Sequence, residues 1–193
     1  IALGKSQNMD NQILNETSIP FVGAIIFTGS SSGTFTALEE SDDRNSAKIL
    51  WSYNTSASID STASVDVDNK IIFFGNNNGE FYAFNITSNI TDDNIVPLWT
   101  FTEGGSVGRS MPSFDGQNVY IGTADKKLYA IDKFSGQKRW SFTSLDGNFE
   151  NAAAVIGGDG TLYIGSNQHS SGYSRLYAIN PSTGSIVNSI LFT

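Results

Sequence analysis

The chain has 193 residues, a net charge of −8 and no cysteine, and this length can bury one sizeable hydrophobic core. The missing cysteines exclude disulfide scaffolds, thiolate zinc sites and cysteine nucleophiles. Since no basic stripe or long apolar run is present, nucleic acid, anionic membrane surfaces and a membrane span are not expected.

Short alternating apolar segments, separated by turn residues, predict strands along the whole chain. Tight turns such as Asp115-Gly116 and Asp159-Gly160 favour hairpins between them. No segment has helical periodicity, so the sequence predicts an all-β protein. In chain order, the expected strands are 18–22, 25–29, 34–38 and 48–53; 61–67, 71–74, 80–84 and 97–101; 110–114, 119–122, 127–131 and 138–142; and 151–156, 161–165, 175–179 and 185–192.

These strands fall into four copies of one repeat. Each copy has an aromatic strand with a central alanine, an apolar triplet closed by glycine before it, and, in the first three copies, a tryptophan after it. The alanines are Ala37, Ala83, Ala130 and Ala178, the glycines are Gly29, Gly75, Gly122 and Gly165, and the tryptophans are Trp51, Trp99 and Trp140. A fixed period of this length with four short strands is typical of a β-propeller blade.

The segment VYIGTADKKLYAIDKFSGQKRWSF (119–142) closely resembles the repeat of the pyrroloquinoline-quinone-like (PQQ-like) β-propellers. The resemblance implies blades at about 13–55, 56–103, 104–144 and 145–193, and it includes the propeller lipoproteins of outer-membrane β-barrel assembly. It also implies that the tryptophans dock against the neighbouring blade. Asn188 stands where the fourth blade would have its tryptophan, so the interface after that blade should be built differently.

Propellers of this family close with seven or eight blades, and this sequence accounts for four. Three explanations are open: a fragment of a longer chain, a homodimer whose two chains complete one ring, or a self-closed disc of four blades. An open arc would expose hydrophobic faces, so we expect a part of a longer extracytoplasmic protein.

Residues for conventional catalysis are scarce. His169 is the single histidine and lies in an expected loop, where it reads as an exposed side chain. The acidic runs at 39–43 and 92–93 lack the spacing of an EF-hand loop. We therefore expect no catalytic residue and no metal site.

The family name raises the question of the quinone. In the quinoprotein dehydrogenases, the resemblance implies a calcium ion and a catalytic aspartate in the axial funnel, and in many of them a disulfide of adjacent cysteines. This chain has no cysteine, and none of its segments matches the catalytic motif. No cofactor is therefore expected, and PQQ with calcium is the alternative.

One set of charged residues emerges from aligning the copies. The position just before the first strand of each blade, at the axial mouth, is occupied by Thr17, Asp60, Arg109 and Glu150. One hypothesis is a polar collar that binds a ligand or a partner. The other is an inter-blade salt-bridge set in which Arg109 neutralises Asp60 and Glu150.

The sequence as a whole favours a non-catalytic protein-interaction scaffold of the cell envelope or cell surface, with a protein partner. The alternative is a fragment of a PQQ- and calcium-dependent quinoprotein oxidoreductase. Repeat scaffolds carry many functions, so the choice between the two depends on the site.

Overall fold

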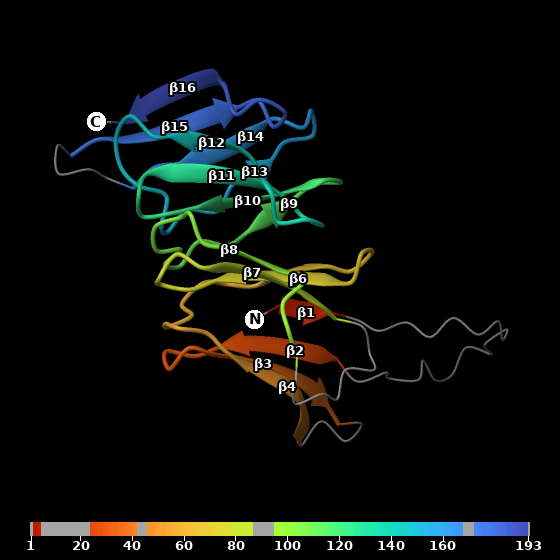
Figure 1. The fold of residues 1–193 in the computed structure, drawn as a ribbon. Coiled ribbons are helices and arrows are strands. Elements are labelled where there is room, and N and C mark those ends of the chain that lie inside the picture. The colour runs from red at the N-terminus through yellow and green to blue at the C-terminus, as the bar shows by residue number, and fades with distance from the viewer. Residues whose placement is uncertain (1, 5–23, 42–45, 87–94, 168–171, 193) are drawn as a thin grey trace, which may run out of the picture.

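The computed structural model describes residues 2–4, 24–41, 46–86, 95–167 and 172–192. These residues form the strands β1 to β16 and no helix, which confirms the all-β prediction. The strands build four antiparallel sheets of four strands each, stacked one after another in chain order (Figure 1).

Each sheet is a meander in which neighbouring strands along the chain are also neighbours in space. The first sheet contains β1 (Ala2–Gly4), β2 (Ile25–Gly29), β3 (Thr34–Glu40) and β4 (Ala47–Asn54). The second contains β5 (Ser64–Asp66), β6 (Ile71–Gly75), β7 (Phe81–Asn85) and β8 (Trp99–Phe101). The third contains β9 (Ser113–Phe114), β10 (Asn118–Gly122), β11 (Lys127–Asp132) and β12 (Lys138–Thr143). The fourth contains β13 (Val155–Ile156), β14 (Leu162–Gly165), β15 (Ser174–Ile179) and β16 (Ile186–Phe192).

The first sheet differs from the sequence prediction at its first strand. Residues 18–22, the expected strand, lie outside the described residues, and the place beside β2 is taken by β1, with Ala2 opposite Phe27. The expected blade boundary at residue 13 therefore leaves out a strand that this sheet contains. Two apolar segments, residues 1–3 and 18–22, precede β2 in the sequence. The strand pattern alone does not show which of the two pairs with β2, because it does not define the length of the connection between the paired strands.

A row of three residues crosses each sheet at the repeat alanine. In the second sheet Ala83 lies between Phe73 and Trp99, whose rings are 6.0 Å apart. Because alanine is small, the two large rings meet above it, which explains why the repeat requires alanine there. The equivalent rows are Phe27–Ala37–Trp51, Tyr120–Ala130–Trp140 and, in the fourth sheet, Tyr163–Ala178–Asn188.

The tryptophan of one sheet docks against the glycine turn of the next sheet. The indole N–H of Trp99 donates to the carbonyl of Lys133 (3.0 Å), and a Cβ on Gly136 would lie 2.6 Å from the Trp99 ring. Trp140 donates to Pro181 (2.8 Å) and packs in the same way against Gly184. Both glycines have φ of 71°, a conformation that other residues rarely adopt.

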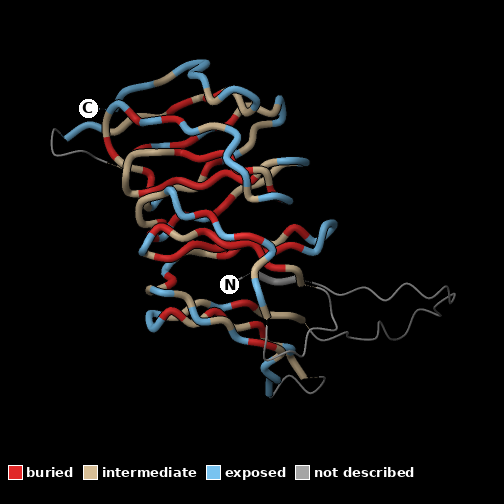
Figure 2. Tube along the Cα trace, viewed as in Figure 1, coloured by how far each residue is buried: buried red, intermediate tan, exposed pale blue. Residues whose placement is uncertain are grey.

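Three hydrophobic clusters fill the spaces between consecutive sheets. Figure 2 shows the buried residues concentrated in the middle strands of the stack. Sheets two and three are covered on both faces, whereas sheets one and four have one face each without a neighbouring sheet among the described residues.

In the first three sheets, the glycine that ends the second strand accommodates a side chain from the following connection. A Cβ on Gly122 would lie 2.6 Å from Cβ of Phe149, and Gly29 and Gly75 face Ile59 and Val107 in the same way. Around Gly165 no atom lies within 4 Å of the corresponding position, so these equivalent glycines are not under the same constraint.

We predict that Gly122→Ala lowers the free energy of unfolding by about 1–3 kcal/mol, because the added methyl group overpacks the site. Gly165→Ala is the matched control and should leave the stability almost unchanged. Urea unfolding followed by tryptophan fluorescence measures both variants. Equal effects would contradict the assignment of the two glycines to different environments.

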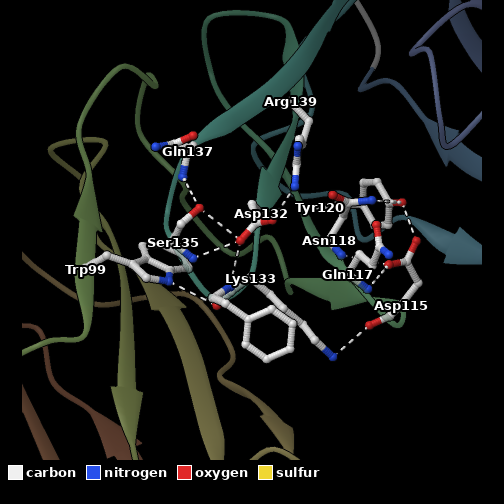
Figure 3. A network of polar contacts seen from close by, with 11 residues as sticks. Trp99, Asp115, Gln117, Asn118, Tyr120, Asp132, Lys133, Ser135, Gln137 and Arg139 are labelled. Carbon is white, nitrogen blue, oxygen red and sulfur yellow. Dashed lines mark hydrogen bonds and ion pairs between the residues drawn. The ribbon is translucent and has the colours of Figure 1, made fainter.

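One buried ion pair connects the second and third sheets. Nζ of Lys133 lies 2.6 Å from Asp66, and both side chains are at most 4% exposed. The same ammonium donates to the carbonyl of Asp115 (2.9 Å) and lies 5.6 Å from the centre of the Phe114 ring. Figure 3 shows Lys133 between Trp99 and Asp115. The carbonyl of Lys133 accepts the hydrogen bond from the Trp99 indole, and its side chain forms the ion pair with Asp66.

Candidate partner-binding site

The connections between consecutive sheets are anchored in the same way three times. In each, a backbone N–H donates to a carbonyl of the preceding sheet, and the side chain of that residue fills the space over the repeat glycine. The three anchoring residues are Ile59, Val107 and Phe149, which donate to Ser30 (3.0 Å), Asn76 (3.2 Å) and Thr123 (3.1 Å).

This anchoring shows which residues are equivalent. Asp60 and Glu150 each directly follow an anchoring residue, and the third residue in that position is Gly108, with φ of 56°. Counted from the anchoring residues, Arg109 comes one position later than Asp60 and Glu150. Counted from the paired strand residues Ser64 and Ser113, Asp60 and Arg109 are equivalent.

Asp60 is held in place by its neighbours. Its carboxylate accepts hydrogen bonds from Nδ2 of Asn77 (2.8 Å) and from the hydroxyl of Ser58 (2.8 Å). The bonds from Asn77 and Ser58 lower the pKa of Asp60 despite the opposing effect of desolvation, and the positive charge of Arg109 lowers it further. The carboxylate is therefore charged at neutral pH and its position is fixed.

Glu150 packs against Gly108, the residue that precedes Arg109 in the chain. Cγ of Glu150 is 2.5 Å from where a Gly108 Cβ would be, and the Glu150 carboxylate accepts from Asn148 at 3.3 Å. Arg109 is exposed. The ion pairs within the described ranges join Lys127 to Asp125, Lys133 to Asp66, Lys138 to Glu103, Arg139 to Asp132 and Arg175 to Asp146.

Arg109 thus contributes to the electrostatics of Asp60 without a contact ion pair in this part of the chain. The structure brings Asp60, Arg109 and Glu150 into successive connections, and Thr17 lies outside the described residues. Their chemistry is charge and hydrogen bonding, which suits recognition of a charged or polar group rather than covalent catalysis. We name the set formed by Asp60, Arg109 and Glu150 the charged collar.

A cavity of about 210 Å³ lies between the first sheet and the connection that leads to the second sheet, and Asp60 is the residue of the charged collar that lines it. Asp60, Ser61 and Thr62 contribute its polar wall, and Phe27, Phe35 and Ile59 contribute its apolar wall. The volume is below the roughly 300–1,000 Å³ typical of small-molecule sites. A side chain of a partner fits this space better than a large ligand does.

The structure does not offer a built metal site where it is described. Among those residues, no three histidine, cysteine or acidic side chains come together to hold a metal ion. His169, Asp42, Asp43, Asp92 and Asp93 lie outside the described residues. The expectation of no cofactor stays a prediction.

Four consecutive four-stranded meanders, each with the glycine, alanine and tryptophan positions of one repeat, define the chain as part of a PQQ-like β-propeller. The model of one protein family, described as outer membrane protein assembly factor BamB, matches residues 5–154. The chain belongs to this family. No helix in the portion that the structure describes is long and apolar enough to cross a membrane.

Several solved structures share the fold. BamB from Moraxella catarrhalis has 18% sequence identity and a TM-score of 0.63, over 98% of this chain and 52% of that one. Quinohemoprotein alcohol dehydrogenase ADHIIG from Pseudomonas putida HK5 has 14% identity and a TM-score of 0.66, over 88% and 33%. The computationally designed Ika8 protein has 14% identity and a TM-score of 0.63, over 86% and 46%.

At these identities the likeness concerns the fold alone. The chain spans about half or less of the length of these three structures. No curated protein matches the sequence. A propeller fold shared by an assembly factor, a dehydrogenase and a designed protein does not define an activity.

Proposed function

We propose that this chain is a non-catalytic protein-interaction scaffold that works outside the cytoplasm, in the cell envelope or at the cell surface. The observation that carries the proposal is the family match over residues 5–154, whose description is that of an outer membrane protein assembly factor. The net charge of −8 and the charged collar are consistent with a scaffold that recognises charged groups of a protein partner.

The charged collar is the contact that we assign to the partner. Asp60 is fixed by two hydrogen bonds, and Arg109 is exposed and makes no ion pair within the described ranges. A cation that is not engaged within the fold can pair with a carboxylate of another protein at little desolvation cost.

We predict that Arg109→Ala changes the free energy of unfolding by no more than about 0.5 kcal/mol, as expected for an exposed side chain. The same change should abolish capture of envelope proteins by the immobilised chain. Lys48→Ala, an equal loss of charge on β4, is the control and should retain capture. A strong destabilisation by Arg109→Ala would favour the salt-bridge hypothesis instead.

The quinoprotein alternative has one observation in its favour, the fold likeness to quinohemoprotein alcohol dehydrogenase ADHIIG. The chain has no cysteine, and the described residues assemble no metal-binding group. We therefore predict that PQQ and Ca²⁺, added together, leave the melting temperature unchanged. A ligand at 100 times its Kd would add about 2.7 kcal/mol of stability, so a clear rise would favour the oxidoreductase.

The outer face of the fourth sheet bears on how the propeller is completed. Val155, Tyr163 and Ile190 lie on this face and are 63%, 38% and 53% exposed, although Tyr120, the equivalent of Tyr163, is fully buried. We propose that a further blade with an apolar face packs here, either from a longer chain or from another one.

The first sheet of a second copy fits this face poorly. Its outer face carries Thr28 and Thr36, where the second sheet has Phe74 and Tyr82 in contact with its neighbour. The hydroxyl of Thr28 donates to the carbonyl of Gly29, and the hydroxyl of Thr36 bonds to that of Ser52. Threonine offers less apolar surface than Phe74 and Tyr82 do, so less free energy is gained when this face is buried. A head-to-tail homodimer is therefore the less favoured way to complete the ring.

A further inference from the structure

The edge strand β16 differs from every other sheet edge in the described part of the chain. It is the last strand of the fourth sheet and has seven residues, IVNSILF, none of them charged. Ile186, Val187, Ile190, Leu191 and Phe192 are 42–63% exposed. A long, uncharged and apolar edge strand presents free backbone groups on which another strand can pair.

The other edges are protected by the means that natural sheets use. At the corresponding position of the first and third sheets, β4 carries Lys48 and β12 carries Lys138 and Arg139. In the second sheet, β8 has three residues and follows Pro97. The opposite edges, β1, β5, β9 and β13, have two or three residues each.

The repeat register makes the contrast specific. Each long outer strand has a bulge at the residue that precedes the tryptophan position by one. In β4 this residue is Leu50, in β12 it is Arg139, and in β16 it is Val187; β4 carries its charge at Lys48 instead. The fourth sheet thus has a valine at the place where the third sheet carries a protecting charge.

One backbone donor of β16 is held by a local bond. The N–H of Ser189 donates to Oδ1 of Asn188 at 2.8 Å. Asn188 stands at the tryptophan position of the repeat, and in the other blades that side chain covers the next sheet instead. An incoming strand would have to displace this bond. The bond therefore lowers the affinity of β16 for another strand but does not prevent pairing.

From these observations we infer that β16 binds an extended, uncharged segment of a partner protein by strand addition to the fourth sheet. Ile190 and Phe192 project on one face of β16, and Leu191 projects on the other. The segment therefore has β-branched, aromatic or threonine side chains on both of its faces. The inference rests on the proposed scaffold function and specifies the class of partner and its place of binding.

A partner segment is favoured over a second copy of the chain. Two copies each carry a net charge of −8, which opposes their association, whereas an uncharged segment meets no such repulsion. The edge also lies at the outer end of the meander, β13-β14-β15-β16. A further blade packed on the face of the fourth sheet would leave its backbone groups accessible.

The test uses a fluorescein-labelled peptide of alternating threonine and valine and measures its fluorescence anisotropy with the full chain. We expect binding to the wild type and at least about tenfold weaker binding to Val187→Lys. Ser182→Lys, the same charge change in the preceding turn, should bind as the wild type does. The peptide N-methylated at its valines should not bind, because its backbone donors are removed.

A second variant, Asn188→Ala, is expected to change the affinity for the peptide in the opposite direction. Loss of the side chain frees the Ser189 N–H, so the peptide should bind more tightly than to the wild type. Equal binding to Val187→Lys, or equal binding of the N-methylated peptide, would overturn the inference. So would a wild-type dimer that Val187→Lys converts to a monomer, since β16 would then serve a second copy.

The peptide measurement is independent of the envelope partner. If Arg109→Ala fails to affect capture while the peptide binds β16 as expected, the charged collar is refuted and the strand addition stands. If capture depends on Arg109 while Val187→Lys leaves peptide binding unchanged, the strand addition is refuted and the charged collar stands.

Discussion

Replacing Asp66 with alanine is expected to lower the free energy of unfolding by about 3–5 kcal/mol, because it leaves a buried charge without its partner. The ammonium of Lys133 would retain the Asp115 carbonyl and lose the carboxylate at 2.6 Å. Replacing both residues by apolar ones, Asp66→Leu with Lys133→Met, should recover most of the loss.

Glu103→Ala is the control for this variant, because Glu103 and Lys138 also join the second and third sheets as an ion pair but are 57% and 39% exposed. An exposed pair contributes about 0.2–1 kcal/mol. Urea unfolding at neutral pH measures all these variants. Similar losses from Asp66→Ala and Glu103→Ala would show that burial does not set the strength of the inner pair.

The same carboxylate makes the stability depend on pH. Desolvation raises the pKa of Asp66, but the hydrogen bonds from Lys133 and Asn69 outweigh it and hold the pKa below its ordinary value of 3.8. A folded-state pKa below that of the unfolded chain stabilises the fold above the ordinary value. The contribution is lost as the pH falls below 3.8 through the folded-state pKa, and Asp66→Ala should remove this part of the acid dependence.

The second large effect is expected for Trp99→Ala, with a loss of about 3–5 kcal/mol for truncating a buried ring. Trp99 is 8% exposed, contacts Phe73 and Phe81, and hydrogen-bonds across the sheet boundary to Lys133. The variant opens a cavity between the second and third sheets and leaves that carbonyl without its donor.

Asn188→Ala tests the same repeat position in the fourth sheet. Asn188 is exposed and has no following sheet to contact among the described residues, so the change should stay within about 0.5 kcal/mol. Thermal unfolding followed by circular dichroism compares the two variants. A comparable loss from Asn188→Ala would contradict the assignment of Asn188 to an uncovered face.

The repeat itself made most of the fold predictable. Strand periodicity and the glycine, alanine and tryptophan positions located the strands of the last three sheets, because each of these residues has a packing reason that recurs. The expectation drawn from Asn188, that the interface after the fourth sheet is built differently, stays a prediction. The first strand could not be chosen, since pairing of β1 with β2 depends on a long connection that leaves no periodic trace.

The site was predictable in part. The charged residues lie in successive connections, but the residues that anchor these connections, Ile59, Val107 and Phe149, were not identified from the sequence, because their role depends on the backbone bonds that they make across the sheet boundary. The Lys133–Asp66 pair was missed altogether. Lys133 follows a strand in a turn, where lysine ordinarily reads as solvent-exposed, and its burial arises from packing between sheets.

The unlike end faces give the stack a direction, as in a filament with one end that accepts a subunit and one that does not. Thr28 and Thr36 terminate one end, while Tyr163 and Ile190 leave the other ready for a neighbour. Contacts that run from one end of a subunit to the opposite end of the next continue without limit unless a rotation closes them. Threonine at these two positions reduces the apolar surface with which one copy of this chain could pack on the next, and we expect phenylalanine and tyrosine in their place to strengthen such end-to-end contacts.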